Sequence, residues 1–495
     1  MTPLIGSFAV GLLLVALLAG LLVSWRRPYL ALGFLVAGMA FHNFILMVLL
    51  RLGTPGLLVR VYQGWKEAIL ALLALMALVH LHRLWRAGNL PRPILSDWLA
   101  IAFGVLACIY FLVPQHLLGG ESNFTERLLA FRSAMYLPLL YFIGRAFAAP
   151  ASTRDHRQVA WVLAGSAAVV GAFGLGELWL LPTRIWVDWG ENLFNAWLGF
   201  SYKGPGNLPD NFFQTLPGGP LLLRRMVSTY LSPLGIAYTG ILVLPPAVVL
   251  VDRARGRSRR LLYAAGVVLA LVLAGILFSV TRLAIACLVV EAALLAVVLN
   301  ERWVGGLTLL LAMLAAGMFF VYPLVGPVVG RNLNPARASY NTSIVSANDP
   351  SAQEHSFFLI GDAELVVHHP LGVGLGSAVF RYGNGNRSGE SAVLSVFVDM
   401  GVVGGLVYLG MYLLAMLHGY RAYRALAPRT ILAMLPLVAS VGGVALFPIT
   451  MTSDIWGATA VTYLFWWAAG HCATLATLRK QASTNLDTTP SESAV

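Results

Sequence analysis

The sequence predicts an all-α polytopic membrane protein with about 12–13 transmembrane helices. Hydrophobic residues make up 58% of the chain and charged residues only 11%, whereas soluble domains carry about 25% charged residues. Apolar runs of about 20 residues recur along the chain, which is the length that a helix needs to cross a bilayer core. These runs lack the two-residue alternation of membrane β-strands, so helices, which satisfy their own backbone groups, are the predicted spanning elements.

The apolar runs divide the chain into candidate spans that belong to one transmembrane domain, residues 1–480. Residues 481–495 carry Ser and Thr without an apolar pattern, so we expect them to form a disordered cytoplasmic tail. The thirteen candidate spans are centred near Leu14, Gly38, Ala74, Val105, Leu140, Ala167, Gly240, Val268, Val290, Leu311, Leu406, Ala439 and Leu464.

Basic residues gather in loops that alternate with loops poor in basic residues. All of the basic loops fall on one side if the N-terminus is outside and the C-terminus is inside, and the positive-inside rule identifies that side as the cytoplasm. The net charge of +12 therefore reflects topology and not a nucleic-acid-binding face. The basic loops are residues 26–27, 82–93, 154–157, 252–260, 302, 418–429 and 479–480.

Two long segments, residues 182–226 and 322–389, are predicted to lie outside the membrane, opposite the basic loops. They contain Trp, Gly, Pro and Asn, and the second includes a helix-like stretch, 351-SAQEHSFFLIGDAELVVHHP-370. Loops of this length in a compact protein are usually functional or disordered. Their aromatic and apolar content argues against disorder, so we expect them to carry function.

Four arginines on the predicted outer side are not explained by the positive-inside rule. A single arginine at a membrane boundary can extend its charged end to water. Several on one face beneath long loops favour an anion site instead, because the planar guanidinium fork matches phosphate oxygens. The expected ligand is a lipid-linked phosphate or pyrophosphate. The four residues are Arg224, Arg225, Arg282 and Arg381.

Glu390 lies where the chain re-enters the membrane, in 389-GESAVLSVFVDMG-401. This carboxylate either acts on a substrate or stabilises the start of the following helix, because an acid is favourable at a helix N-terminus. His368 and His369 either bind a ligand or form a helix-end pair next to the last carbonyl groups.

Four further acids are candidates for function. Glu291 and Asp399 fall inside predicted spans, where ionisable residues are functional hypotheses by default, although Asp399 fits a helix-packing contact equally well. Glu177 and Asp362 near the outer boundary are weaker candidates. The chain has no phosphate-cradling glycine loop, nucleophile elbow or HExxH pattern and no metal-ligand spacing. We therefore expect activity without a metal or other cofactor.

Three parts of the sequence together resemble the bacterial O-antigen ligase and polymerase superfamily. One resembles the family's arginine followed by a small-residue and aromatic turn and a proline, and another resembles the arginine that opens a later span. The third resembles the His-Pro-Leu-x-Gly-x-Gly turn with the segment that re-enters the membrane. The resemblance covers roughly the second half of the chain. The stretches are 225-RMVSTYLSP-233, 281-TRLAIA-286, and 369-HPLGVGLG-376 with 390-ESAVLSVFVDMGVVGGL-406.

The resemblance implies a GT-C-like integral-membrane glycosyltransferase of the bacterial inner membrane with a periplasmic active site. Such an enzyme transfers a glycan from undecaprenyl pyrophosphate to an acceptor sugar hydroxyl, with inversion and without a metal. Arg225 and Arg282 are then expected to stabilise the leaving pyrophosphate, and Glu390 to take the acceptor proton. The expected substrate-binding residues are Arg224, Arg381, His368 and His369.

One departure from the family separates the possible activities. Ligases of this kind usually carry His-Asn where this chain has Glu390 and Ser391. The change favours a polymerase that joins O-antigen, capsule or exopolysaccharide repeat units over a ligase that transfers glycan to lipid A-core. A flippase of lipid-linked sugars is a weaker alternative, because the unusual charges gather at the outer boundary. A polymerase is expected to work beside a flippase and a chain-length regulator.

Overall fold

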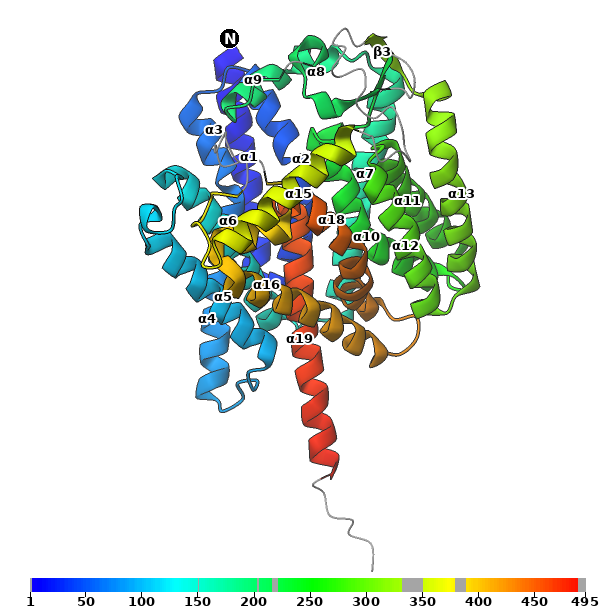
Figure 1. Cartoon of the computed structure of the whole chain (residues 1–495). Helices are drawn as coiled ribbons and strands as arrows, with labels where there is room; N and C mark the ends of the chain where they lie inside the picture. Colours follow the sequence, from blue (N-terminus) through cyan, green and yellow to red (C-terminus); the bar gives the residue numbers. More distant parts are fainter. Residues whose placement is uncertain are drawn as a thin grey trace, which may run out of the picture.

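The computed structural model describes residues 2–149, 151–202, 204–215, 221–331, 350–378 and 389–487, which form a bundle of long helices with a small sheet at one end (Figure 1). The strands are β1 (Phe213–Thr215), β2 (Leu221–Arg224) and β3 (Val328–Arg331). The helices are α1 (Thr2–Arg26), α2 (Ala31–Arg51), α3 (Gly56–Gln63), α4 (Trp65–Arg86), α5 (Leu95–Leu112), α6 (Phe124–Phe147), α7 (Thr153–Leu180), α8 (Ile185–Trp189), α9 (Glu191–Trp197), α10 (Pro233–Ala254), α11 (Arg259–Phe278), α12 (Arg282–Leu299), α13 (Arg302–Val325), α15 (Pro350–His368), α16 (Ala392–Arg424), α17 (Met434–Leu437), α18 (Gly443–Thr452) and α19 (Thr459–Asp487).

The described ranges contain 10 helical segments that are long and apolar enough to cross a membrane. This confirms the predicted class of a helical, multi-pass membrane protein. Every predicted span centre lies in a helix. Helices α6, α13 and α19 are not among the ten; α6 and α19 carry charged or polar side chains, whereas α13 is uncharged from Trp303 to Val325. The crossing of the bilayer by these three helices stays a prediction.

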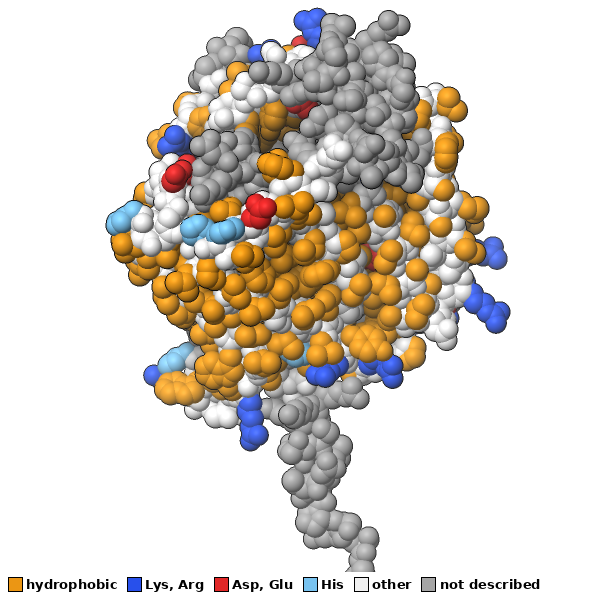
Figure 2. Space-filling view, viewed as in Figure 1, with side chains coloured by type: hydrophobic (Ala, Val, Ile, Leu, Met, Phe, Trp, Pro, Cys, Tyr) orange, Lys and Arg blue, Asp and Glu red, His pale blue; other side chains and the backbone are white. Residues whose placement is uncertain are grey.

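Burial separates central helices from peripheral ones. In the most apolar window of α10, 94% of the residues are buried, against 17% in α1. A helix that is apolar all round and fully enclosed belongs to the centre of a bundle. Peripheral helices expose large apolar side chains, which form a broad field across the middle of the visible face, with Lys and Arg along its lower edge (Figure 2). Soluble proteins rarely expose apolar patches of such extent.

A three-stranded antiparallel sheet with the order β1-β2-β3 joins the two long loops. The sequence analysis predicted no strands there, because runs of three or four residues are too short for an alternation to be recognised. Strands β1 and β2 belong to the first loop, and β3 follows α13 in the second. Elements of both loops, α8, α9 and β3, lie at the end of the bundle where the chain begins (Figure 1).

Two predicted boundaries can be compared with the structure. Helix α15 coincides with the predicted helix-like stretch of the second loop. Helix α19 continues to Asp487, so residues 481–487 are helical where we expected the disordered tail to begin. The apolar pattern ends earlier than the helix, and the pattern was the signal on which that boundary depended. Residues 488–495 lie outside the described ranges.

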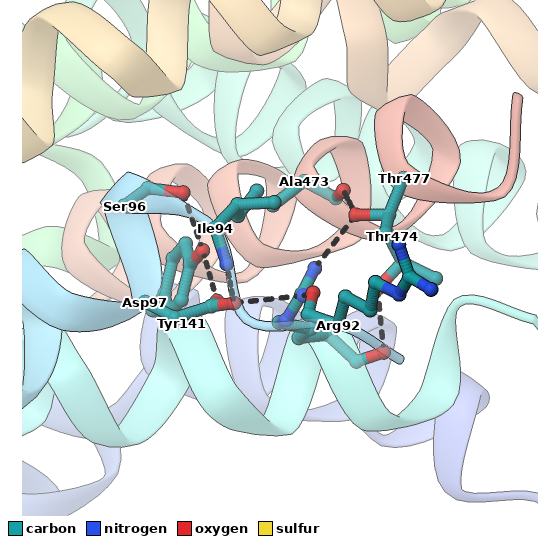
Figure 3. Close-up of polar contacts among 9 residues, drawn as sticks. Arg92, Ile94, Ser96, Asp97, Tyr141, Ala473, Thr474 and Thr477 are labelled. Carbon is teal, nitrogen blue, oxygen red and sulfur yellow. Dashed lines mark hydrogen bonds and ion pairs between the residues drawn. The ribbon is translucent and has the colours of Figure 1, made fainter. Parts of the chain in front are cut away.

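A buried ion pair ties α5, α6 and α19 together at the end of the bundle opposite the sheet (Figure 3). Arg145 Nη2 on α6 lies 2.7 Å from Asp97 Oδ2 on α5. Tyr141 donates a hydrogen bond of 2.7 Å to the same carboxylate, and Thr474 of α19 donates one of 2.8 Å to the Arg145 carbonyl. Both charged side chains are less than a tenth exposed, so each depends on the other for its solvation.

Removing one member of this pair is expected to destabilise the protein strongly. Asp97→Leu leaves a buried guanidinium without its carboxylate, a change that costs about 3–5 kcal/mol. The double variant Asp97→Leu/Arg145→Met replaces both charges with apolar side chains and is expected to regain most of that loss. Thermal unfolding of the purified variants in detergent measures both effects. A double variant no more stable than the single one would contradict the prediction.

Candidate functional site

The two neighbouring arginines Arg224 and Arg225 lie at the end of strand β2 and leave the backbone in different directions. Successive side chains of a strand point to opposite faces. The backbone around them is held on both sides: the Arg224 amide donates to the Pro327 carbonyl at 2.9 Å, and the Arg225 amide donates to the Phe212 carbonyl at 2.8 Å. The sheet therefore fixes where each guanidinium can go.

Arg224 points into the protein and is fully engaged there. Its Nη2 lies 2.6 Å from Glu177 Oε1, and its Nη1 donates to the Leu181 carbonyl at 2.5 Å. The same Glu177 oxygen accepts a bond of 3.1 Å from the Trp186 indole. Arg224 is 3% exposed. This geometry favours a structural role for Arg224 and Glu177, in place of the substrate contact that we expected for Arg224.

Arg225 points toward the short connection between α11 and α12. Its Nε donates to the Ser279 carbonyl at 2.7 Å, and its Nη2 donates to the Thr281 hydroxyl at 2.9 Å. These bonds use two of the five donors of a guanidinium. Both partners are neutral, and no carboxylate in the described ranges forms an ion pair with Arg225. The Arg225 guanidinium is thus a positive group whose remaining N–H donors could bind an anion.

The connection that holds Arg225 has an unusual backbone. Val280 has a φ of 50°, which is uncommon for a β-branched residue and strains the chain. Such strain persists where the surrounding structure imposes it and is typical of functional sites. Here it turns the chain so that Ser279 and Thr281 face Arg225 while Arg282 begins α12. Both predicted cationic residues therefore meet at one turn.

The pKa of Arg225 reflects both its burial and the nearby charge of Arg282. Burial lowers the pKa of Arg225 to about 10. The positive charge of Arg282 also lowers this pKa, whereas the phenol groups of Tyr238 and Tyr322 raise it. Because the guanidinium still carries its charge at neutral pH, two cations face each other across the turn. A bound anion between or beside them would relieve their repulsion.

Glu390 lies just before α16 and contacts a histidine that the sequence analysis did not single out. Its Oε2 pairs with His355 Nδ1 on α15, and both side chains are less than half exposed. The helix cap is Ser391, whose hydroxyl accepts from the Leu394 amide at 3.0 Å. Glu390 is therefore not the capping residue, which weakens the purely structural explanation of this carboxylate.

Asp362 is a second carboxylate beside Glu390. It lies on α15, seven residues after His355 and therefore on the same helix face. A Cβ added at Gly389 would lie 2.9 Å from both Asp362 oxygens, so only glycine lets the chain pass this close. Burial raises the pKa of Asp362 to about 7, and the negative charge of Glu390 adds to the effect. The segment before α16 is thus enclosed by titratable groups.

Tyr238 lies near both the cationic and the acidic groups. It stands in the second turn of α10, and its side chain interacts electrostatically with both Arg225 and Glu390. Its hydroxyl lies 2.8 Å from the Ser453 hydroxyl. The Ser453 carbonyl in turn accepts from the Ala392 amide at 3.1 Å, in the first turn of α16. This chain of contacts brings residues of the three sequence stretches into one cluster, the outer site (Arg225, Tyr238, Arg282, His355, Asp362 and Glu390).

The glycine turn after α15 is held by Asp399 of α16. Its carboxylate accepts bonds of 3.0–3.1 Å from the amides of Gly376, Ser377 and Ala378. Gly372 has a φ of 80°, and a Cβ there would lie 2.5 Å from the Gly401 amide. Asp399 is therefore a packing contact that anchors the turn, as one of the two interpretations of this residue anticipated.

The remaining predicted residues lie elsewhere. His368 ends α15, where its Nδ1 donates to the Glu364 carbonyl at 2.8 Å, and His369 follows the helix. They follow His355 by 13 and 14 residues, and 13 residues span about 20 Å along a helix, so the structure does not join them to Glu390. Arg381 lies outside the described residues. Glu291 is fully buried in α12, and both carboxylate oxygens lack a hydrogen-bond partner in the described part of the chain.

Comparisons with known proteins add no family assignment. Neither the family models nor the curated proteins gave a match for this chain. Within the described ranges, no group of three or more His, Cys, Asp or Glu side chains could hold a metal ion. The chemistry of the outer site therefore has to be argued from its own residues: a pair of guanidinium groups, a tyrosine, and a carboxylate paired with an imidazole.

The raised pKa of Asp362 predicts a pH dependence of stability. In the unfolded chain an Asp has a pKa of about 3.9, so the folded protein holds this proton more tightly. The group's contribution to stability is full below about pH 4 and is lost as the pH rises through about 7. Asp362→Asn removes this loss, so we expect the variant to gain stability relative to the wild type as the pH rises from about 4 to about 7, with a constant difference above about pH 7.

Thermal unfolding of both proteins across that pH range measures the difference. Glu390→Gln removes the neighbouring negative charge, which contributes to the raised pKa of Asp362. In a Glu390→Gln background, Asp362→Asn is therefore expected to gain less stability. Glu364→Gln, an exposed acid on the same helix, serves as the control and should leave the gain unchanged. Parallel pH profiles for the wild type and Asp362→Asn would show that Asp362 does not titrate in this way.

Proposed function

We propose that the protein is a membrane glycosyltransferase that polymerises glycan repeat units carried on undecaprenyl pyrophosphate. The observation that supports this most directly is Arg225, a largely buried cation with neutral partners that faces a second cation, Arg282. The start of α12 adds the positive end of a helix dipole to the two charges. Such an arrangement suits the phosphates of a leaving pyrophosphate at a membrane boundary.

The leaving group carries the first part of the proposed mechanism. As the bond between the anomeric carbon and the pyrophosphate oxygen breaks, negative charge builds on the pyrophosphate. Preorganised guanidinium donors stabilise that charge more in the transition state than in the substrate, which accelerates the step. Arg225 is held by two hydrogen bonds before substrate arrives, so little reorganisation is needed.

The acceptor carries the second part. Its hydroxyl attacks the anomeric carbon from the side opposite the leaving group, which inverts the configuration, and it must lose a proton as the new bond forms. The pair of Glu390 and His355 has the composition of a general base and the group that orients it. In our proposal this pair takes the acceptor proton, and the glycosidic bond moves from pyrophosphate to the acceptor oxygen. No metal or nucleotide is needed, because the donor is already activated.

A ligase that transfers the glycan to lipid A-core is the second candidate, and His355 is the observation that favours it. Ligases that this chain resembles carry a histidine at the position of Glu390. Here an imidazole reaches the same place from α15, a different part of the chain. The base would then combine a carboxylate and an imidazole whether the enzyme is a polymerase or a ligase. The identity of the acceptor therefore has to be determined by experiment.

Conservative substitutions in the outer site are expected to abolish most transfer. Arg225→Lys keeps the charge but loses the planar fork, and the loss of such a donor typically lowers the rate on the order of 10²-fold. Glu390→Gln removes the proton acceptor and should lower the rate by roughly 10²–10⁴-fold. Purified variants in proteoliposomes, supplied with lipid-pyrophosphate-linked repeat units, are assayed by the length of the glycan formed.

Matched variants separate chemistry from folding. Arg184→Lys changes an arginine of the first long loop that is 85% exposed, and Glu364→Gln changes an exposed acid on α15. Both should retain activity and membrane insertion. Wild-type activity of Glu390→Gln would reject its role in proton transfer, and wild-type activity of Arg225→Lys would reject the proposed pyrophosphate site.

Deletion of the gene distinguishes the reaction types. Single repeat units left on undecaprenyl pyrophosphate at the outer face, with no longer chains, are the expected result for a polymerase. Long chains that remain attached to that lipid would identify a ligase. Units trapped on the cytoplasmic face would identify a flippase and would contradict the proposed function. The readout is the length and the membrane side of the lipid-linked glycans.

A further inference from the structure

A basic pocket of about 290 Å³ lies between the ends of four helices, far from the outer site. It is formed where α1 passes into α2 and where α6 passes into α7. Helix α7 separates it from the outer end of the bundle: Asp155 near the pocket precedes Glu177 by 22 residues, about 33 Å along the helix. The lining residues are Arg26, Arg27, Pro28, Tyr29, Phe147, Ala151, Ser152, Arg154 and Asp155.

The charge of the pocket favours an anion. Three arginines line it against one carboxylate, Asp155. That carboxylate is already engaged, because it accepts bonds of 3.0 Å and 2.6 Å from the amide and hydroxyl of Ser152 in a capping box. Arg27 Nη1 lies 3.9 Å from Asp155 Oδ1 and 3.4 Å from Gln158 Oε1, so neither contact holds the guanidinium closely. For Arg26 and Arg154 the described chain offers no ion-pair partner.

Beneath the arginines lie buried polar groups that have no partner within the described residues. Tyr29 lines the pocket and is 3% exposed, yet its hydroxyl makes no hydrogen bond. His156 and His471 pack against its ring, with centroids 4.6 Å and 5.7 Å away. His156 Nε2 and both nitrogens of His471 also lack partners. The Tyr29 hydroxyl is closed to solvent, so this side chain forms part of the pocket wall, and the exposed arginines are the groups that are open to a ligand.

The surroundings of the pocket connect it to lipid. Leu18, Leu22 and Trp25 precede the arginines on α1 and are 59–63% exposed. They lie on a peripheral, membrane-spanning helix, where large exposed apolar side chains contact acyl chains, and Trp is typical of the membrane interface. The pocket opens on the side that the basic loops mark as cytoplasmic, where anionic lipids attract arginine clusters. A headgroup in the pocket would place its acyl chains along α1.

We propose that this pocket binds the phosphodiester of an anionic membrane phospholipid. The guanidinium groups of Arg26, Arg27 and Arg154 bind the phosphate oxygens, and Tyr29 and Phe147 form part of the pocket wall beside the headgroup. The lipid thereby fills the space between α1, α2 and α7 at the membrane boundary. This site is separate from the proposed glycan transfer and does not depend on it.

Lipid titrations followed by native mass spectrometry of the full-length protein in detergent test the proposal. Phosphatidylglycerol is expected to bind, and phosphatidylcholine to bind much more weakly. Arg154→Gln should weaken phosphatidylglycerol binding about fivefold, the usual effect of one arginine near an anionic lipid.

Arg260→Gln is the matched control, because Arg260 is an exposed arginine in the first turn of another helix, α11, on the same predicted side. It should bind phosphatidylglycerol like the wild type. Equal binding of the two lipids, or equal effects of Arg154→Gln and Arg260→Gln, would overturn the proposal. Inorganic phosphate that binds the wild type but not Arg154→Gln, without any preference for phosphatidylglycerol, would assign the pocket to a soluble anion instead.

Discussion

The buried pair of Glu177 and Arg224 is the interaction on which the outer end of the protein depends. It attaches the end of α7 to strand β2, and β2 joins the two long loops through its neighbours in the sheet. A buried charge without its partner is costly, so the pair fixes the register of β2 on the bundle. Once Arg224 is held on one face of the strand, Arg225 can only point to the other, toward the turn that precedes Arg282.

Long apolar runs made the helical bundle predictable, because the bilayer requires length and composition that are visible in any window of the sequence. The predicted span centres all fall in helices, and the helix of the second loop was also found. The short strands were missed, since three or four residues carry too little periodicity. The sequence analysis placed the end of the last helix near residue 480, whereas α19 continues to Asp487, beyond its apolar pattern.

The outer site was predictable only in part. The arginines and Glu390 stood out because charge is rare at a membrane boundary. His355 and Tyr238 did not, since a histidine in a helical part of a loop and a tyrosine in an apolar helix are ordinary in sequence. Only the packing of α15 against α16 and the contact of Tyr238 with Ser453 give them their setting. Arg224 ends β2 and Arg225 follows it, and sequence adjacency concealed that their side chains point in different directions.

The contact of Asp399 with the glycine turn has a consequence for where phosphate can bind. Successive backbone amides that converge on one point form a concave anion receptor, and proteins often use such receptors for phosphate. In this chain the receptor made by Gly376, Ser377 and Ala378 is occupied by the protein's own carboxylate. These amides are therefore not open to phosphate, and in the proposed reaction the pyrophosphate would depend on side chains such as Arg225.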